Sequence, residues 1–292
     1  MFAPAMVAIA VAVSAWGLAP DPGTRIADGV STEAVASGGV VHVWVSSTAG
    51  GMVAYQSTNG LMFTSFADAL TPPGADAAVV PMGRGGWRMY FTQQTPTGKA
   101  IGSAVSGDLL NWSVEPGVRL ELGTSRAAGV PEAVALPDGR VRLYTVASGG
   151  GGAERIDSAI SSDGLTFTSE HGDRLTGGFV DPAGVQLADG SWLMVCSTSP
   201  SSRQRLFVAT SPDGLSWTVS KTPLLDRRDA NALDPTLLPL GGDRFRVYYS
   251  VAAAGKQLTG PYRVESGVLS RHAASATSAT KKHAKRKHKK KP

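Results

Sequence analysis

The 292-residue sequence predicts an all-β fold, a five-bladed β-propeller, from three observations. A seven-residue phrase recurs four times, and the first residues of its copies are 49, 55 and 50 positions apart. Strand-like patterns recur with it, and no ten-residue stretch has the periodicity of an amphipathic helix. Glycine and proline are abundant, with 35 Gly and 18 Pro, as expected for a chain rich in turns. Repeats of this length hold about four strands each, and such units usually close a ring around a channel.

The seven-residue phrase is typical of a tight turn between two strands. Asp-Gly or Asn-Gly supplies the positive φ that a tight turn needs, and Ser and Asp side chains can bond local backbone groups. The Leu and the aromatic residue are expected to point inward and to wedge between neighbouring sheets. We assign the phrase a folding role and no chemistry. Its copies are Ser57–Phe63, Ser106–Trp112, Ser161–Phe167 and Ser211–Trp217.

Two predicted strands precede each phrase. The second strand alternates polar and apolar residues and is rich in aromatic and β-branched side chains. A degenerate first copy runs from about Asp28 through Thr32–Val35 to Val41–Val45, which makes five units. The first strands of the other units are Asp76–Met82, Val130–Leu136, Asp181–Leu187 and Asp234–Leu240, and the second strands are Trp87–Phe91, Val141–Thr145, Trp192–Cys196 and Phe245–Tyr249. A sixth blade would need suitable sequence that neither end supplies.

The repeats occupy residues 28 to 269, so we expect one propeller domain over residues 20–272. The lone Cys196 lies in an apolar strand and is expected to be an inert buried thiol.

Residues 1–19 are uncharged and rich in Ala, Val and Met, which predicts a signal peptide with Val13-Ser14-Ala15 as its cleavage site. An uncleaved membrane anchor is the alternative, because no Lys or Arg precedes the stretch. The expected location is extracellular or at the cell surface.

The C-terminal segment 273–292 is predicted to be a disordered basic tail. Lys281–Pro292 holds seven Lys and one Arg, and subtracting these eight charges from the formal +5 leaves −3 for the rest of the chain. The tail could bind an anionic cell-wall polymer or a membrane surface, or nucleic acid inside a cell, or only aid solubility.

Arg and Lys are scattered over the propeller, so no sequence-specific nucleic-acid binding is expected from it. No metal-ligand or cofactor motif is present, and we expect no cofactor and a monomer.

Carboxyl groups from different units are expected to converge at the channel, because the first strand of each propeller blade lines it. Asp76, Asp181 and Asp234 occupy one equivalent position in three units. Glu132 lies two residues further along its strand, on the same face. Glu33 matches Glu132 in the first unit, with Asp28 just upstream.

Such acids could hydrolyse a glycosidic bond, which requires one protonated carboxyl group and one ionised carboxylate. Crowding raises the pKa of one carboxyl group and helps to keep it protonated. In the competing structural interpretation, Asp begins each blade by bonding backbone N–H groups at the channel mouth.

The pattern resembles the five-bladed propeller glycosidases, which include arabinanases, β-xylosidases, invertases and levansucrases. The resemblance implies that Asp76 orients the general acid and that Glu132 is the nearest counterpart of that acid. For the base or nucleophile of the first blade, Asp28 is the first substitute and Glu33 the second. Glu33, Asp181 and Asp234 would then bind substrate. The acid position of the family corresponds to Val130 and the base position to Ser31.

The phrase also resembles a shortened Asp-box of sialidases, and Arg25-Ile26 is distantly similar to their arginine motif. Sialidases bind a substrate carboxylate through arginines. Five repeats rather than six make this resemblance the weaker one. The loop arginines that could serve are Arg126, Arg174, Arg203, Arg227 and Arg228.

Three functions remain open from the sequence. The first is a secreted glycoside hydrolase acting on a poly- or oligosaccharide. The second is a non-catalytic carbohydrate-binding or cell-surface interaction propeller, which accounts for the missing acids. The third is a scaffold that binds protein partners across the flat face of the ring.

Overall fold

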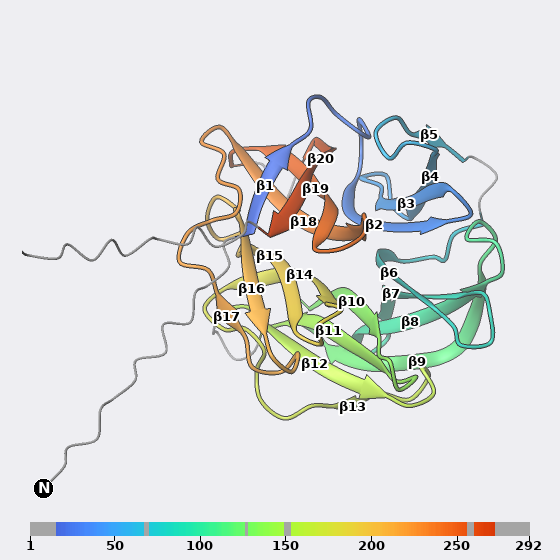
Figure 1. Ribbon diagram of the computed structural model, residues 1–292. Coiled ribbons are helices and arrows are strands. Elements are labelled where there is room, and N and C mark those ends of the chain that lie inside the picture. Colours follow the sequence, from blue (N-terminus) through green and yellow to red (C-terminus); the bar gives the residue numbers. More distant parts are fainter. Residues whose placement is uncertain (1–15, 67–69, 126–127, 149–152, 256–259, 272–292) are drawn as a thin grey trace, which may run out of the picture.

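The computed structural model describes residues 16–66, 70–125, 128–148, 153–255 and 260–271. Within these ranges the chain forms twenty strands and no helix, and the strands make five four-stranded sheets. The sheets are arranged radially around a central axis (Figure 1). The predicted five-bladed β-propeller is confirmed. Within the described ranges, no helix could cross a membrane.

Each of the first four blades uses four consecutive strands, starting from the strand nearest the axis. Blade 1 contains β2 (Val30–Ser37), β3 (Val40–Ser46), β4 (Met52–Ser57) and β5 (Thr64–Ser65). Blade 2 contains β6 (Ala75–Pro81), β7 (Trp87–Thr95), β8 (Gly98–Ser106) and β9 (Ser113–Gly123). Blade 3 contains β10 (Gly129–Ala135), β11 (Val141–Ala147), β12 (Arg155–Ser161) and β13 (Thr168–Ser169). Blade 4 contains β14 (Phe179–Gln186), β15 (Trp192–Thr198), β16 (Leu206–Ser211) and β17 (Thr218–Val219).

Blade 5 joins the two ends of the described chain. It contains β18 (Ala230–Pro239), β19 (Arg244–Ala253) and β20 (Tyr262–Arg271), with β1 (Trp16–Pro20) as its outermost strand. In Figure 1 the blue β1 lies beside the red β20. The Trp16 ring lies 6.2 Å from Phe245, and the Arg271 guanidinium lies 5.1 Å from the Trp16 ring centroid. An N-terminal strand therefore closes the ring.

The closing strand changes the predicted domain boundary. Residues 16–19 fall in the range assigned to the signal peptide, but they belong to β1 of the propeller. The domain thus includes Trp16 and does not begin at residue 20. The expected cleavage site at Val13-Ser14-Ala15 and the basic tail 273–292 lie outside the described residues.

All five innermost strands share a bulge near the residue that begins the repeat. Pairing with the second strand shifts register there in every blade. The residue at this position has positive φ each time, a conformation that Asp tolerates better than most residues and β-branched residues rarely adopt. The five residues are Ser31 (53°), Asp76 (58°), Val130 (47°), Asp181 (54°) and Asp234 (45°). Part of the reason for the repeated Asp is therefore the positive φ of the bulge, a structural reason that the sequence analysis did not foresee.

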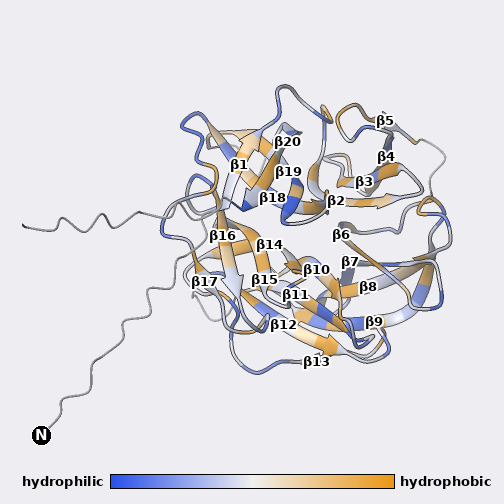
Figure 2. Cartoon of the chain, in the orientation of Figure 1, coloured by the Kyte–Doolittle hydropathy of each residue, from blue (hydrophilic) through white to orange (hydrophobic). Residues whose placement is uncertain are grey.

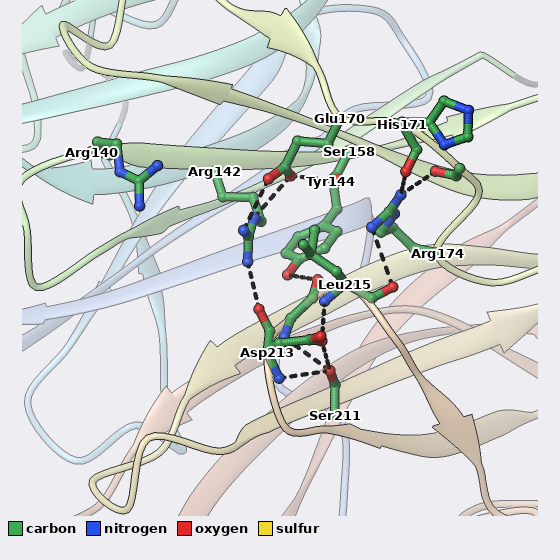
Figure 3. Close-up of polar contacts among 12 residues, drawn as sticks. Arg140, Arg142, Tyr144, Ser158, Glu170, His171, Arg174, Ser211, Asp213 and Leu215 are labelled. Carbon is green, nitrogen blue, oxygen red and sulfur yellow. Dashed lines mark hydrogen bonds and ion pairs between the residues drawn. The ribbon is translucent and has the colours of Figure 1, made fainter.

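The seven-residue phrase fastens each blade to the preceding one, as Figure 3 shows for blades 3 and 4. Asp213 Oδ1 accepts hydrogen bonds from two backbone N–H groups of its own turn, each at 2.8 Å. Tyr144 donates to the Gly214 carbonyl at 2.8 Å, and Trp217 packs edge-on against the Tyr144 ring at 5.9 Å. Arg142 bonds the Asp213 carbonyl at 3.1 Å and pairs with Glu170. The predicted folding role of the phrase is confirmed.

The junction between blades 1 and 2 departs from this pattern. Leu109 has a φ of 66° at the place where the other three copies carry glycine. Its side chain is only 1% exposed, so packing in the core offsets the strained backbone. Trp44 replaces the tyrosine of the other junctions and meets Trp112 edge-on at 5.7 Å.

The hydrophobic core lies between the blades. Figure 2 shows hydrophobic residues along the strands and more hydrophilic residues in the connecting loops. Separate clusters of buried side chains fill the spaces between neighbouring sheets. Cys196 is fully buried, as expected, and burial raises the pKa of its thiol.

Candidate functional site

A pocket opens at the end of the channel where the innermost strands begin. Its volume is about 210 Å³, and it opens to solvent. Deeper along the axis the channel narrows to a cavity of about 20 Å³, little more than one water molecule needs. We call the larger space the mouth pocket and the smaller one the channel cavity. The two share the bulge residues Asp76, Val130, Asp181 and Asp234, so these residues separate the mouth from the channel.

Asp181 and Asp234 form a buried pair at the base of the mouth pocket. The two carboxyl groups are hydrogen-bonded to each other, and the Asp234 backbone N–H donates to Asp181 Oδ2 at 3.3 Å. The Ser197 hydroxyl also donates to Asp181 Oδ2. Burial raises the pKa of Asp181 to about 6, although these bonds oppose the shift.

Asp234 binds its proton more tightly than an ordinary carboxyl group does. Burial raises its pKa well above the usual value, and the negative charges of Asp181 and Asp76 raise it further. Asp76 belongs to the blade across the pocket and is half-buried, with its backbone N–H donating to Ser46 Oγ at 3.0 Å. The mouth therefore places two carboxyl groups with raised pKa values beside another acid within one pocket.

Glu33 and Glu132 line the channel cavity and link blades across it. Glu33 accepts a hydrogen bond from Val79 N at 2.8 Å and another from Thr236 Oγ1 at 3.0 Å. It thereby joins blade 1 to blades 2 and 5. Glu132 accepts from Gly184 N at 3.1 Å and joins blade 3 to blade 4.

Both channel glutamates hold protons more tightly than ordinary carboxyl groups. Burial raises the pKa of Glu33 to about 7. Burial and the charge of Glu33 raise the pKa of Glu132 well above its usual value. Because each also accepts a backbone N–H from another blade, their positions suit a structural role on the axis.

The predicted site residues thus occupy three places. Asp76, Asp181 and Asp234 reach the mouth pocket, while Glu33 and Glu132 line only the channel cavity. Asp28 is exposed and lines neither space, and its carboxylate accepts weak bonds of 3.5 Å from Thr48. The predicted trio of Glu132, Asp76 and Asp28 is not brought together.

In this chain, two of the three positions that correspond to the carboxylates of the propeller glycosidases carry no acid. Ser31 and Val130 stand at the bulges of blades 1 and 3, and both line the channel cavity. Only Asp76, in blade 2, retains a carboxyl group at its position. Glu132 lies two residues from Val130, and its carboxylate accepts a hydrogen bond from Gly184 N.

The mouth contains four residues that the sequence analysis missed: Glu154 and Gln204 lie in loops, whereas Lys99 and Tyr262 lie at the starts of β8 and β20. None of them occupies a position that recurs between the repeats, so no pattern in the sequence marked them. Gln204 is only 2% exposed, and it donates through Nε2 to Asp181 Oδ2 at 3.5 Å and to Ser197 Oγ at 3.4 Å. No group of three metal-ligating side chains occurs in the described part of the chain.

The arginines considered for a carboxylate-binding site do not line the mouth pocket where they are described. Arg25 and Arg174 donate to the carbonyls of Leu61 and Leu215 in the turn phrases, at 3.0 and 3.2 Å. Arg203 pairs with Asp226. Arg126 lies outside the described residues. The described arginines therefore do not form a sialidase-like site.

No model of a known protein family matches the sequence, and no curated protein is similar to it. Solved structures with the same fold include a thermostable family-43 glycoside hydrolase, with a TM-score of 0.68 and 13% identity over 89% of this chain and 94% of that one. An endo-1,4-beta-xylanase of Bacteroides thetaiotaomicron has a TM-score of 0.64 and 13% identity over 86% and 96%. A GH62 alpha-L-arabinofuranosidase catalytic domain of Coprinopsis cinerea has a TM-score of 0.63 and 13% identity over 88% and 96%.

The comparisons agree with the arrangement of the strands and with the expected resemblance. At this level of identity the likeness concerns the fold alone. The function of the site has to be argued from the residues that line the mouth pocket. This chain has the five-bladed propeller fold of the glycoside hydrolases.

Proposed function

We infer that this protein binds a poly- or oligosaccharide at the mouth pocket without hydrolysing it by the three-carboxylate mechanism. One observation carries the inference: the mouth pocket is present, whereas Ser31 and Val130 replace acids at two of the three expected positions. The mouth offers carboxyl and amide groups within one open pocket. Such groups suit the hydroxyls of a sugar.

The position of Glu132 supports binding rather than turnover. Glycoside hydrolysis needs carboxyl groups on both sides of the scissile bond, roughly 5 to 9.5 Å apart. Glu132 lines a cavity of about 20 Å³ and accepts a hydrogen bond from the backbone of the next blade. A sugar ring does not fit beside it there.

A glycan array and a hydrolysis panel test the proposal together. We expect the wild type to retain glycans on the array and to release no product from aryl-furanosides or polysaccharides. Asp76→Asn should weaken binding by about tenfold, because it removes a charged acceptor from the mouth. Glu132→Gln should leave binding unchanged.

The outcomes separate the parts of the proposal. Hydrolysis that disappears in Glu132→Gln would restore the enzymatic interpretation. Failure of the full-length protein to bind any glycan would overturn carbohydrate recognition altogether, and it would favour the protein-scaffold function.

We also propose that the protein works outside the cell, held at the surface by its tail. The uncharged residues 1–15 that precede β1 and the cationic segment Lys281–Pro292 support this location. Cell fractionation of the full chain and of a chain lacking residues 281–292 tests it. We expect the shorter chain to shift from the envelope to the medium, and recovery of both in the cytosol would contradict the proposal.

A further inference from the structure

The mouth pocket is rich in hydrogen-bond acceptors and poor in cations. Its ionisable side chains include one lysine, Lys99, and that ammonium group donates to the Ala128 carbonyl at 2.9 Å. The acidic side chains that line the pocket therefore outnumber its single lysine. Its acidic side chains are Asp76, Glu154, Asp181 and Asp234.

Gln204 presents a buried acceptor that has no partner. Its backbone N–H donates to Asn231 Oδ1 at 2.9 Å, and its side-chain Nε2 faces Asp181 and Ser197. This orientation is set by Asp181, because an amide oxygen turned toward the carboxylate would be repelled. Oε1 is left buried without a hydrogen bond. A buried acceptor of this kind is costly unless something donates to it.

A ligand with N–H or O–H groups can supply the donor that Gln204 Oε1 lacks. The described residues contain no cluster of three side chains that could hold a metal. A primary ammonium group has three donors and no acceptor, and it carries the charge that balances a carboxylate. A neutral hydroxyl has one donor and brings lone pairs of its own.

We propose that the mouth pocket selects a sugar that carries a free amino group, such as a glucosamine residue, and holds its ammonium group between the Asp181–Asp234 pair and Gln204 Oε1. The proposal rests on the carbohydrate binding inferred above and names the class of sugar. It also provides a donor for Gln204 Oε1, a buried side-chain acceptor that has no partner among the described residues.

Proton release is a consequence of this arrangement. The groups that face the pair across the pocket are Asp76, Glu154, Lys99 and Tyr262. The raised pKa of Asp234 favours its protonated form before a ligand binds. An ammonium group beside it favours the ionised form, so the pocket should lose a proton as an amino sugar binds near neutral pH.

Titration calorimetry on the full chain tests the inference. The ligands are oligomers of glucosamine, N-acetylglucosamine and glucose with the same linkage and length. We expect the glucosamine oligomer to bind at least about tenfold more tightly than the others. Its binding enthalpy should depend on the ionisation enthalpy of the buffer, as proton release requires.

Two variants and one control locate the selectivity. Asp234→Asn, which tolerates the positive φ, and Gln204→Leu should each reduce the glucosamine preference by about tenfold. Asp138→Asn makes the same chemical change in the exposed turn at the opposite end of β10 and should preserve it. Circular dichroism confirms that each variant is folded.

The outcomes distinguish this inference from the proposed function. Equal affinity for glucosamine and glucose oligomers overturns the amino-sugar inference and leaves carbohydrate binding intact. Binding to none of the three oligomers overturns the amino-sugar inference, and the glycan array then decides separately whether carbohydrate binding stands. An Nα-acetyl-lysine amide that binds as tightly as the glucosamine oligomer would also overturn the inference, because the ammonium group would then not need a sugar.

Discussion

Two sets of repeated aspartates lie at opposite ends of the propeller and have opposite properties. At the turn phrases, Asp163 and Asp213 accept backbone N–H groups of their own turns, and these bonds lower the pKa of each carboxyl group. At the mouth, burial raises the pKa of Asp181 and of Asp234. The same residue at the same repeat period is thus a solvated structural acid at one end and a proton-holding group at the other.

The contrast shows that repetition reports architecture, whereas environment decides chemistry. The turn aspartates are exposed and fully engaged with local backbone. The mouth aspartates are 7% and 8% exposed for Asp181 and Asp234, and they face acids from other blades. Only the mouth aspartates line a pocket in which they could bind a ligand.

The turn end should be the more important for stability, and Trp217→Ala is the strongest test. This change removes the ring that packs against Tyr144 and Trp192 between blades 3 and 4. We expect a loss of about 3 kcal/mol in the free energy of unfolding, measured by urea denaturation. Trp217→Phe should lose less. A loss below about 1 kcal/mol for the alanine variant would mean that the phrase is not an inter-blade fastener.

The axial and mouth acids should give an unusual pH dependence. Burial raises the pKa of Glu33 to about 7 and that of Asp181 to about 6, both above their unfolded values. Such groups bind protons more tightly in the folded state, so their contribution is fully present below the unfolded pKa and is lost as pH rises through the folded pKa. We expect stability to fall by roughly 4 kcal/mol between about pH 5 and about pH 8.

Urea titrations across that pH range measure this effect. Glu33→Gln keeps acceptor and donor atoms near Val79 and Thr236 but cannot ionise, so it should flatten the profile. Stability that rises over this range in the wild type, or an unchanged slope in the variant, would contradict the assignment.

The smallest expected effect is the difference in stability between two variants, one of a turn-phrase aspartate and one of a mouth aspartate. Asp213→Ala leaves the N–H groups of Leu215 and Ser216 without their acceptor and should cost about 1 kcal/mol. Asp234→Asn removes a buried ionisable group, keeps a residue that tolerates positive φ, and should be neutral or slightly stabilising at pH 8. Thermal unfolding of both at pH 8 measures the difference. Equal destabilisation would erase the distinction between the two sets.

Much of the fold was predictable because its signals are local and periodic. The four turn phrases and five strand pairs fixed the number of blades, and the aromatic of each phrase packs as expected. The candidate site was less predictable. Asp76, Asp181 and Asp234 converge as their shared position suggested, but Asp28 remains outside and Glu132 faces the channel cavity. Strand register relative to the mouth decides this, and a one-residue bulge shifts it.

The sequence by itself determined a ring of five similar sheets, since each turn and each strand is encoded by its own few residues. Tertiary structure alone decided that Trp16–Pro20 closes the ring, that Gln204 lies at the mouth, and which carboxyl groups have raised pKa values. These properties depend on burial and on charges from residues fifty or more positions away. Neither burial nor such distant charges leave a trace in the local pattern of the chain.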